Sequence, residues 1–261
     1  MKKFTAFLFT IVILSTTLLK AQKTDTLPSR VYSWDSLTTK KEPTRIIRPV
    51  LEGSTNSLAR FEVHSTTLEP GKAPHAAHTH NDWEELIIVK EGRLKITIKG
   101  ASKVIGRGSI AFVMPGDEHG IQNVGDTQAT YYILTYKSKL PPNPDRAKQN
   151  GGSFIMDWND IALKKNDKGA RRDFFNKPTS QLEKFEMHTT ALNAGLDSHA
   201  PHTHKEEEII LILKGNVKMY IAGELIKAAP GDVVFLSSGV SHALKNTGSE
   251  QSEYFAFQWR N

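Results

Sequence analysis

Ten histidines fall into a repeated pattern in this chain of 261 residues. Each has a counterpart 123 or 124 residues away: His64 and His188, His75 and His199, His78 and His202, His80 and His204, and His119 and His242. The residues around them differ between the copies, for example Pro70 in the first and Ala194 in the second. Because imidazole serves as a metal ligand and as an acid–base group, histidines retained among changed neighbours indicate a chemical role in both copies.

The closest spacing in each copy is a His-x-His pair. Residues i and i+2 of a strand point to the same face, so both rings of a pair would lie side by side. Two such nitrogens can take adjacent positions on a divalent cation at ~2.0–2.2 Å. A glutamate at the start of the next apolar run and a later histidine can complete each set. The predicted metal ligands are His78, His80, Glu85 and His119 in the first copy and His202, His204, Glu208 and His242 in the second.

Three imidazoles and one carboxylate suit Mn, Fe, Co, Ni, Cu or Zn and leave coordination positions open for a substrate. A redox-active Mn or Fe fits this donor set slightly better than Zn. We therefore expect one divalent transition metal in each copy. Glu84 in the first copy and Glu206 and Glu207 in the second are neighbouring alternatives as carboxylate ligands, but the spacing to the following glycine favours Glu85 and Glu208.

Further candidates for acid–base chemistry accompany the predicted ligands. In each copy a Glu-x-His pair would share one strand face, where it either orients the metal ligands or faces solvent. Another histidine, three residues before the His-x-His pair, either lines the pocket or bonds to a loop. The candidate catalytic residues are therefore Glu62, His64 and His75 in the first copy and Glu186, His188 and His199 in the second.

Two arginines, Arg48 and Arg172, are also retained between the copies, outside the histidine clusters. Arginine is suited to two-pronged recognition of a carboxylate. Both are candidate substrate-binding residues, and a salt bridge between the two halves is the alternative.

The repetition extends beyond the histidines and defines the domain organisation. Residues 60–66 read RFEVHST and residues 184–190 read KFEMHTT. A linker rich in proline and glycine separates the copies. The prediction is a signal peptide at residues 1–21, an N-terminal domain at 22–140, a linker at 141–152 and a C-terminal domain at 153–261.

The apolar pattern within each copy is typical of strands. Residues 94–98 and 217–221 alternate between apolar and polar types, which indicates strands with one wet face. Residues 86–89 and 209–213 are continuously apolar, as in strands covered on both faces. Only residues 157–165 resemble a short helix. Short strands separated by turns predict an all-β fold, with a sandwich or jelly-roll β-barrel in each half.

Composition excludes several functional classes. Because the chain has no cysteine, disulfide frameworks, thiolate metal sites and cysteine nucleophiles are absent.

Residues 1–21 combine a basic start with an apolar stretch of about 16 residues, shorter than the ~20 of a membrane span. We therefore expect an exported protein, periplasmic or secreted, with a retained anchor as the alternative. Removing three lysines with this segment leaves 34 − 3 = 31 basic residues against 28 acidic ones. Without a basic aromatic patch, nucleic-acid binding is not expected.

The motifs around the histidines resemble those of the cupin superfamily. The stretches 71–92 and 195–215, Gly-x6-His-x-His followed by Glu and Gly, resemble its first motif. Stretches 108–123 and 231–246, which contain His119 and His242, resemble its second. The similarity covers nearly the whole mature chain as a compact two-domain protein. Met114 and Ser237 stand where the second motif usually has proline, and the spacer of the first motif is slightly long.

This resemblance implies a tandem pair of cupin-type jelly-roll barrels, each with a metal inside its mouth held by the predicted ligands. Two-domain relatives include oxalate decarboxylases, dioxygenases, isomerases, storage proteins and ureidoglycine aminohydrolases. We expect an enzyme that decarboxylates, oxygenates or isomerises a small carboxylic acid, enol or sugar derivative. A metal-containing binding protein without turnover and a storage protein are the alternatives. The expected partner is a small molecule, with no nucleic acid and, after signal removal, no membrane; a homo-oligomer is left open.

Overall fold

The computed structural model describes residues 25–261, so the predicted signal peptide lies outside the described residues. The strands of the N-terminal barrel are β2 (Lys40–Glu42), β3 (Arg45–Gly53), β4 (Leu58–Leu68), β5 (Glu84–Glu91), β6 (Leu94–Ile98), β7 (Ala101–Ile105), β8 (Ile110–Val113), β9 (His119–Asn123), β10 (Ala129–Ser138) and β11 (Phe154–Met156). Seven form a large sheet in the order β11-β8-β5-β10-β4-β3-β2, and β7-β6-β9 form a small one. The named strand pairs in both sheets are antiparallel.

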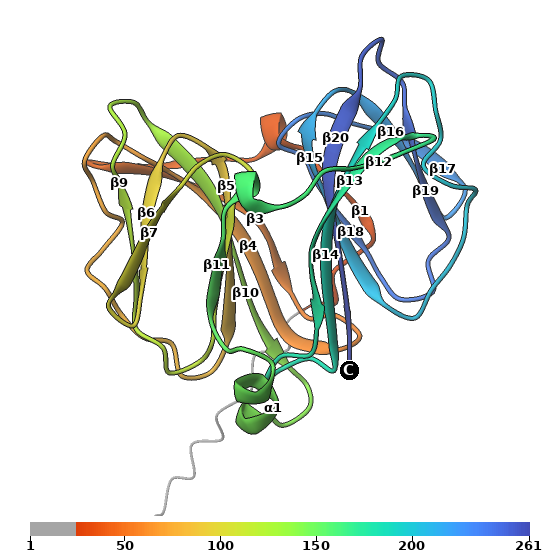
Figure 1. Cartoon of the computed structure of the whole chain (residues 1–261). Coiled ribbons are helices and arrows are strands. Elements are labelled where there is room, and N and C mark those ends of the chain that lie inside the picture. The colour runs from red at the N-terminus through yellow and green to blue at the C-terminus, as the bar shows by residue number, and fades with distance from the viewer. Residues whose placement is uncertain (1–24) are drawn as a thin grey trace, which may run out of the picture.

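The C-terminal barrel repeats this arrangement. Its strands are β1 (Arg30–Tyr32), β12 (Lys164–Asn166), β13 (Gly169–Lys177), β14 (Lys184–Leu192), β15 (Glu207–Lys214), β16 (Val217–Ile221), β17 (Glu224–Ala228), β18 (Val233–Leu236), β19 (His242–Asn246) and β20 (Ser252–Arg260). The large sheet has the order β1-β18-β15-β20-β14-β13-β12 and the small one β17-β16-β19. Figure 1 shows the two large sheets facing each other at the centre, with the small sheets outside.

The apolar patterns in the sequence account for these strands. In β6 and β16 every second residue is buried and the others are half-buried, as their alternation predicts. Residues 86–89 of β5 and 209–212 of β15 are buried, as expected for continuous apolar runs covered on both faces, whereas Leu213 at the end of the second run is half-buried. The all-β expectation is confirmed.

Each large sheet contains one strand from the opposite half of the chain. β1 pairs with β18, with Val31 opposite Val234. Reciprocally, β11 pairs with β8, with Ile155 opposite Ala111. The sequence repeat therefore divides the chain into two similar halves, but each large sheet includes one strand from the opposite half.

The largest hydrophobic core lies between the two large sheets and belongs to both barrels. Its buried aromatic side chains include Phe61 and Phe112 from the N-terminal half and Phe185, Phe235 and Trp259 from the C-terminal half. Two further cores fill the spaces between the large and small sheets of the individual barrels. Burying apolar surface from both halves together stabilises the pair as one unit.

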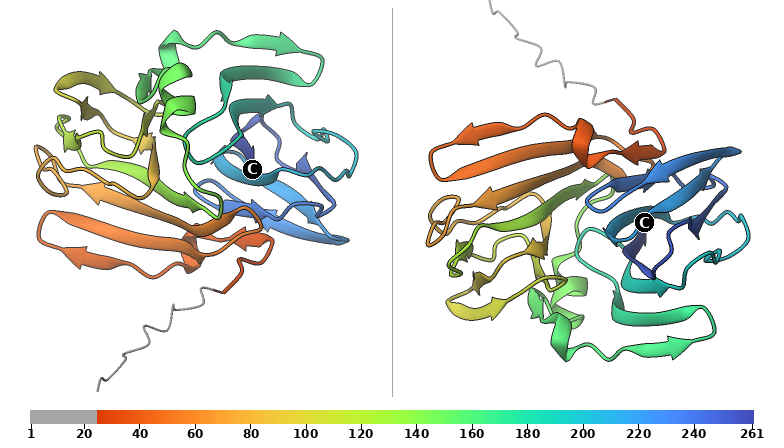
Figure 2. Two further views of the ribbon diagram at one scale, coloured as in Figure 1. Left: turned by 90° about the horizontal axis from the view of Figure 1, so that it is seen from below. Right: turned by 90° about the horizontal axis from the view of Figure 1, so that it is seen from above.

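Helices play a small part in this fold. The linker forms α1 (Pro144–Gln149), which begins after the capping side chain of Asn143 and has a proline in its first turn. It lies beside the junction of the two barrels (Figure 2). The predicted helix at 157–165 is a single 3₁₀ turn at Trp158–Asp160, because the chain then enters β12, which pairs with β13. Among residues 25–261, no helix has the length and apolar character needed to span a bilayer.

Candidate metal centres

The His-x-His pairs lie in extended segments before β5 and β15 rather than inside regular strands. His78 joins β9 through one bridge, in which the backbone N–H groups of His78 and His119 each donate to the other's carbonyl, at 3.0 and 2.9 Å. His202 and His242 form the same bridge, at 3.2 and 3.0 Å. The second histidine of each pair is fixed by its carbonyl, which accepts from the N–H of a positive-φ glycine, Gly116 or Gly239. These contacts hold the segments at the barrel mouths.

In the N-terminal barrel the predicted ligands converge. The Nε2 atoms of His78 and His80 are 2.9 Å apart. Glu85, at the start of β5, places Oε2 3.2 Å from His80 Nε2 and Oε1 3.4 Å from His119 Nε2. Ligand atoms of His78, His80 and His119 all lie within 4.8 Å of one another.

The C-terminal barrel brings together the equivalent set. Glu208 Oε2 lies 3.2 Å from His204 Nε2 and 3.0 Å from His242 Nε2. Ligand atoms of His202, His204 and His242 also lie within 4.8 Å of one another. The structure thus brings together all eight residues predicted as metal ligands, four in each barrel.

Backbone carbonyls orient these rings. The Nδ1–H groups of His119, His204 and His242 donate to the carbonyl oxygens of Asp117, Glu206 and Val240, at 3.2, 2.9 and 2.9 Å. This bonding leaves Nε2 as the atom facing the cluster, the arrangement in which histidine binds metals. The Nε2 atoms of His119 and His242 are buried and lack a well-aligned hydrogen bond.

The donor spacing fits a divalent transition metal. Two ligand atoms that each lie ~2.1 Å from one cation at right angles are about 3 Å apart. The distance of 2.9 Å between the Nε2 atoms of His78 and His80, and the distances of 3.0 to 3.4 Å from imidazole nitrogens to carboxylate oxygens, match that value. A nitrogen-rich set with one carboxylate suits transition metals rather than Mg or Ca.

The protonation states of the two carboxylates and of His78 fit metal binding, whereas contact with Glu208 raises the pKa of His204. Burial favours the protonated form of Glu85, but hydrogen bonds and charges from His119 and His80 prevail and lower its pKa to about 2. Burial opposes ionisation of Glu208 as well, yet His204 and His242 lower its pKa to about 2. Burial, followed by the charge of His119, lowers the pKa of His78 to about 4. At neutral pH these carboxylates are ionised and His78 is neutral, as ligands must be.

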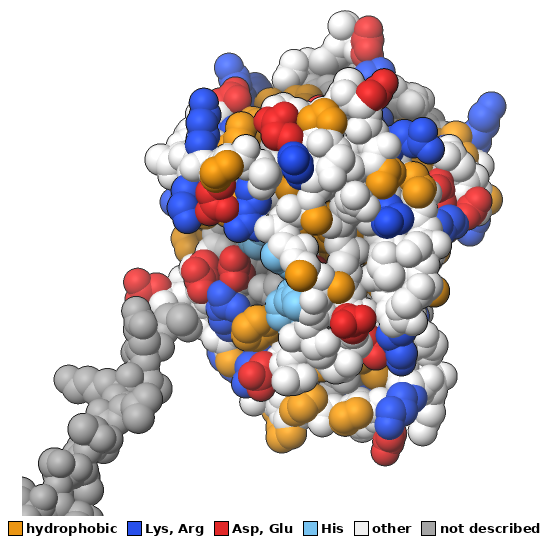
Figure 3. All heavy atoms as spheres, turned by 90° about the vertical axis from the view of Figure 1, so that its left-hand side faces the viewer, with side chains coloured by type: hydrophobic (Ala, Val, Ile, Leu, Met, Phe, Trp, Pro, Cys, Tyr) orange, Lys and Arg blue, Asp and Glu red, His pale blue; other side chains and the backbone are white. Residues whose placement is uncertain are grey.

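Each cluster opens into a cavity. The cavity of the N-terminal barrel, termed the N-terminal cavity, has a volume of about 240 Å³. The cavity of the C-terminal barrel, termed the C-terminal cavity, has a volume of about 540 Å³. On the side of the N-terminal barrel, histidine side chains are visible at the bottom of a hollow flanked by charged side chains (Figure 3).

The Glu-x-His pairs line these cavities beside the clusters, and an orienting role for them stays a prediction. Glu62 and His64 line the N-terminal cavity, with Glu62 Oε1 3.1 Å from His64 Nδ1. Glu186 and His188 line the C-terminal cavity, and their corresponding atoms are 3.8 Å apart. Both pairs therefore border the space that the two cavities enclose.

His75 and His199 occupy the cavity rims. Both side chains are exposed, and each Nδ1 bonds to the carbonyl of the following residue, at 2.8 and 3.0 Å. Each ring contacts the first histidine of the neighbouring pair edge-on, with ring centres 4.2 Å apart. They therefore combine both expected roles, lining a cavity and bonding to a loop.

Arg48 and Arg172 do not reach either cavity. Arg48 stacks on the ring of Trp34 at 4.2 Å and donates to the carbonyls of Trp34 and Leu37. Arg172 stacks on Trp158 at 4.7 Å and donates to the carbonyl of Ile161. Neither residue is among the described residues that line the two cavities. Both arginines fix the chain beside the junction between the barrels instead of contacting the clusters.

Substituting Arg172 with lysine should therefore change stability and not the metal site. Lysine lacks the planar group that stacks on Trp158, so we expect a loss of about 1 kcal/mol in the free energy of unfolding. Metal affinity should stay within twofold of wild type. Urea unfolding and metal titration of the Arg172→Lys variant check this, and a stable variant with impaired substrate turnover would restore the substrate-binding role.

The sequence analysis missed the arginine that does line the C-terminal cavity. Arg171 lies opposite Thr190 in the β13–β14 ladder, whereas Arg172 lies opposite the buried Thr189. Thr190 and His188 line the cavity, so the two-residue period of the strand places Arg171 on that face. Applying this period to both arginines would have selected the correct one. Other cavity-lining residues missed from the sequence are Arg45, Arg60, Trp83 and Tyr131 in the N-terminal cavity and Lys168, Tyr254 and Gln258 in the C-terminal one.

His188 gives the metal-free protein a pH-dependent stability. Burial, and next the charge of Arg171, lower the pKa of His188 to about 4, against ~6.5 in an unfolded chain. Below pH 6.5 the unfolded chain takes up a proton that the folded protein does not. Between pH 7 and pH 5 this residue should therefore lower the free energy of unfolding by about 2 kcal/mol. Urea unfolding of wild type and His188→Gln at both pH values tests this, and an equal loss in the two proteins would contradict it.

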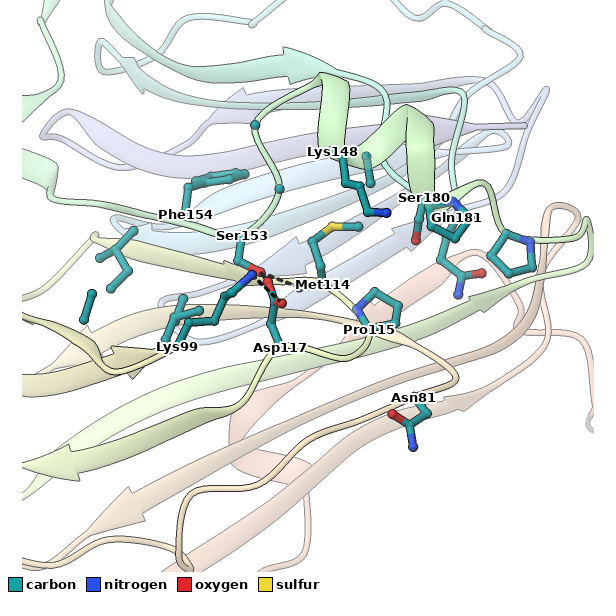
Figure 4. A pocket seen from close by; sticks show the side chains of 18 of the residues that line it. Asn81, Lys99, Met114, Pro115, Asp117, Lys148, Ser153, Phe154, Ser180 and Gln181 are labelled. Atoms are coloured by element: carbon teal, nitrogen blue, oxygen red, sulfur yellow. Dashed lines mark hydrogen bonds and ion pairs between the residues drawn. The ribbon is translucent and has the colours of Figure 1, made fainter.

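A third cavity, termed the linker cavity, has a volume of about 580 Å³ and lies between α1, the β8–β9 loop and the loop that contains Ser180 and Gln181 (Figure 4). Three of its polar residues pair with one another. Ser153 Oγ donates to Asp117 Oδ2 at 2.7 Å, and Lys99 Nζ lies 3.1 Å from Asp117 Oδ1. No histidine is among its described lining residues, so it is separate from the two clusters.

Comparison with known proteins identifies the fold and the family. The chain superposes on the Escherichia coli protein Ylba with a TM-score of 0.70 and 16% identity, covering 92% of this chain and 94% of that one. Oxalate decarboxylase from Lactobacillus farciminis, in a formate complex, gives 0.68 and 16%, covering 91% and 87%. A Bacillus subtilis oxalate decarboxylase variant gives 0.68 and 14%, covering 92% and 79%. A comparison with curated proteins gave no match. The profile described as "Cupin domain" matches residues 64–135 and 188–257, and the chain therefore belongs to the cupin family, with one such domain in each half.

Proposed function

We propose that this protein is a metal-dependent enzyme that decarboxylates a small carboxylic acid in the C-terminal cavity. The observation that carries the proposal is that one cavity of about 540 Å³ joins a three-histidine, one-glutamate cluster to Arg171, Glu186 and His188. The N-terminal cavity has less than half that volume, so the C-terminal one is the better candidate for the reaction.

The residues of the C-terminal cavity have separable roles. His202, His204, Glu208 and His242 would hold the metal, which supplies a Lewis acid for substrate oxygens. Arg171, whose guanidinium pairs with Asp173 and lies 3.5 Å from Glu186, offers a positive charge to a carboxylate. The Glu186–His188 pair can supply the proton that replaces the departing CO₂ on carbon.

The choice of substrate follows from the charges and from the comparisons. Lys168 and Arg171 line the C-terminal cavity together with Asp167, Glu186 and Glu208, and with a divalent metal bound the positive charges would outweigh the negative ones and favour an anion. Two of the structurally similar proteins are oxalate decarboxylases, so oxalate is the first acid to test. Mn and Fe are the metals that we propose, and the 1–21 segment supports export to the periplasm or the medium.

The test uses protein that lacks residues 1–21, loaded with Mn(II) and supplied with oxalate in air. We expect equimolar formate and CO₂, strongly reduced activity in Arg171→Ala, and nearly unchanged activity in the matched Arg172→Lys variant. Failure to bind any transition metal would refute the proposal. Oxalate that binds without turnover would instead identify a binding protein.

A further inference from the structure

Glu84 and Glu207 directly precede the predicted ligands Glu85 and Glu208 and point to the opposite side of their strands. Their exposed fractions are 0% and 2%, and both lie between the two barrels. A buried carboxylate needs hydrogen-bond donors to replace water. Each of these glutamates finds its donors mainly in the opposite half of the chain.

Glu84 is held by the loop between β13 and β14. Its carboxylate accepts hydrogen bonds from Thr179 Oγ1 at 2.7 Å, from the backbone N–H and Oγ of Ser180 at 2.8 and 2.7 Å, and from the N–H of Gln181 at 3.3 Å. Ser180 and Gln181 belong to the C-terminal half and form one side of the linker cavity (Figure 4). The start of β5 is therefore fastened to the other barrel.

Glu207 is held in the same way by the loop between β3 and β4. It accepts from Thr55 Oγ1 and the Asn56 N–H at 2.8 Å each, and from the N–H and Oγ of Ser57. Trp259 adds its indole N–H at 3.1 Å. We call each carboxylate with its loop a clasp: the Glu84 clasp with residues 179–181 and the Glu207 clasp with residues 55–57.

We propose that Glu84 and Glu207 are positioning residues, through which each metal cluster depends on a loop of the opposite barrel. Each clasp fixes the first residue of a strand whose second residue is the carboxylate ligand. The segments that precede these strands, residues 81–83 and 205–206, lie outside the named strands. The clasps therefore determine where the ligand carboxylates stand relative to the histidines, as supporting groups do at other metal sites.

The test is a crossed experiment, and it rests on the metal sites of the proposed function. Thr179→Ala/Ser180→Ala opens the Glu84 clasp, and Thr55→Ala/Ser57→Ala opens the Glu207 clasp. Each is combined with His242→Ala or His119→Ala, so that only one metal site remains, and is titrated with Co(II). Although it lies in the C-terminal half, the first pair should weaken the N-terminal site at least ~10-fold and leave the C-terminal site within twofold. Thr55→Ala/Ser57→Ala should weaken the C-terminal site by at least ~10-fold and leave the N-terminal site within twofold.

A metal-free readout separates the two proposals. Amide hydrogen exchange of Thr179→Ala/Ser180→Ala should accelerate at Glu85 and Leu86 and not at Glu208 and Ile209. If the protein binds no Co(II) but exchange follows this crossed pattern, the metal-dependent function fails and the positioning role stands. Equal effects on both sites, or effects confined to the half that carries the substitutions, would overturn the positioning role. Thr247→Ala, an exposed hydroxyl in the C-terminal half, is the control, and Ser180→Ala alone serves if the double variant does not fold.

Discussion

Replacing His242 with alanine should leave one bound metal ion per chain, where we expect two in the wild-type protein. His242 is 4% exposed and supplies an Nε2 atom that lies 3.0 Å from Glu208 without a well-aligned hydrogen bond. Its removal takes away one of three imidazoles. We therefore expect the metal affinity of the C-terminal site to fall by at least ~100-fold, which exceeds the 10–100-fold loss typical when a supporting residue is removed. Elemental analysis of protein purified after metal loading measures the change.

The same substitution at His119 should empty the N-terminal site and leave the other filled. His199→Ala is the matched control, because this histidine lies on the rim of the same cavity but outside the cluster. The control should retain both ions. A His242 variant that still holds two ions, or a wild-type protein that takes up none, would show that the clusters are not metal sites.

Truncating Phe185 to alanine should lower the free energy of unfolding by about 3–5 kcal/mol, the usual cost of deleting a buried aromatic ring. Phe185 is 2% exposed and lies in the core between the barrels. Its ring centre is 5.9–6.1 Å from those of Phe112 and Tyr136 in one barrel, and 5.0–6.4 Å from Phe175 and Phe257 in the other. Urea unfolding followed by tryptophan fluorescence measures the loss.

Leu225→Ala is the control for this truncation, since Leu225 is 66% exposed and should change stability by less than about 0.5 kcal/mol. The Phe185 variant should also unfold both barrels in one transition, because the residue packs against both. Two separate transitions, or a loss as small as that of the control, would show that the shared core contributes little.

The repeated histidines and the strand pattern were sufficient to predict the fold and the composition of the clusters. The alternation of apolar and polar residues in β6 and β16 belongs to each strand's own sequence, and it reappears in the structure as alternating burial. The i, i+2 spacing predicted that the rings of His78 and His80 lie together, although they stand in an extended segment beside β9 and not in a regular strand. A single bridge replaces the strand because the segment lies at the barrel mouth.

Features that depend on tertiary contacts could not be predicted. The retained pair Arg48 and Arg172 suggested substrate binding, but they are retained because each stacks on a tryptophan and donates to backbone carbonyls. The carboxylates of Glu84 and Glu207 find partners about 95 and 150 residues away, a separation that no local pattern reveals. Helix α1 had a local signal in Asn143 and Pro144, which the prolines of the linker obscured.

The crossing of β1 and β11 into opposite sheets has a consequence for the integrity of the chain. A protease nick within α1 should not release two independent fragments, since each piece would still supply an edge strand to the other. Expressed separately, either fragment would leave β8 or β18 with an open hydrogen-bonding edge, which invites aggregation.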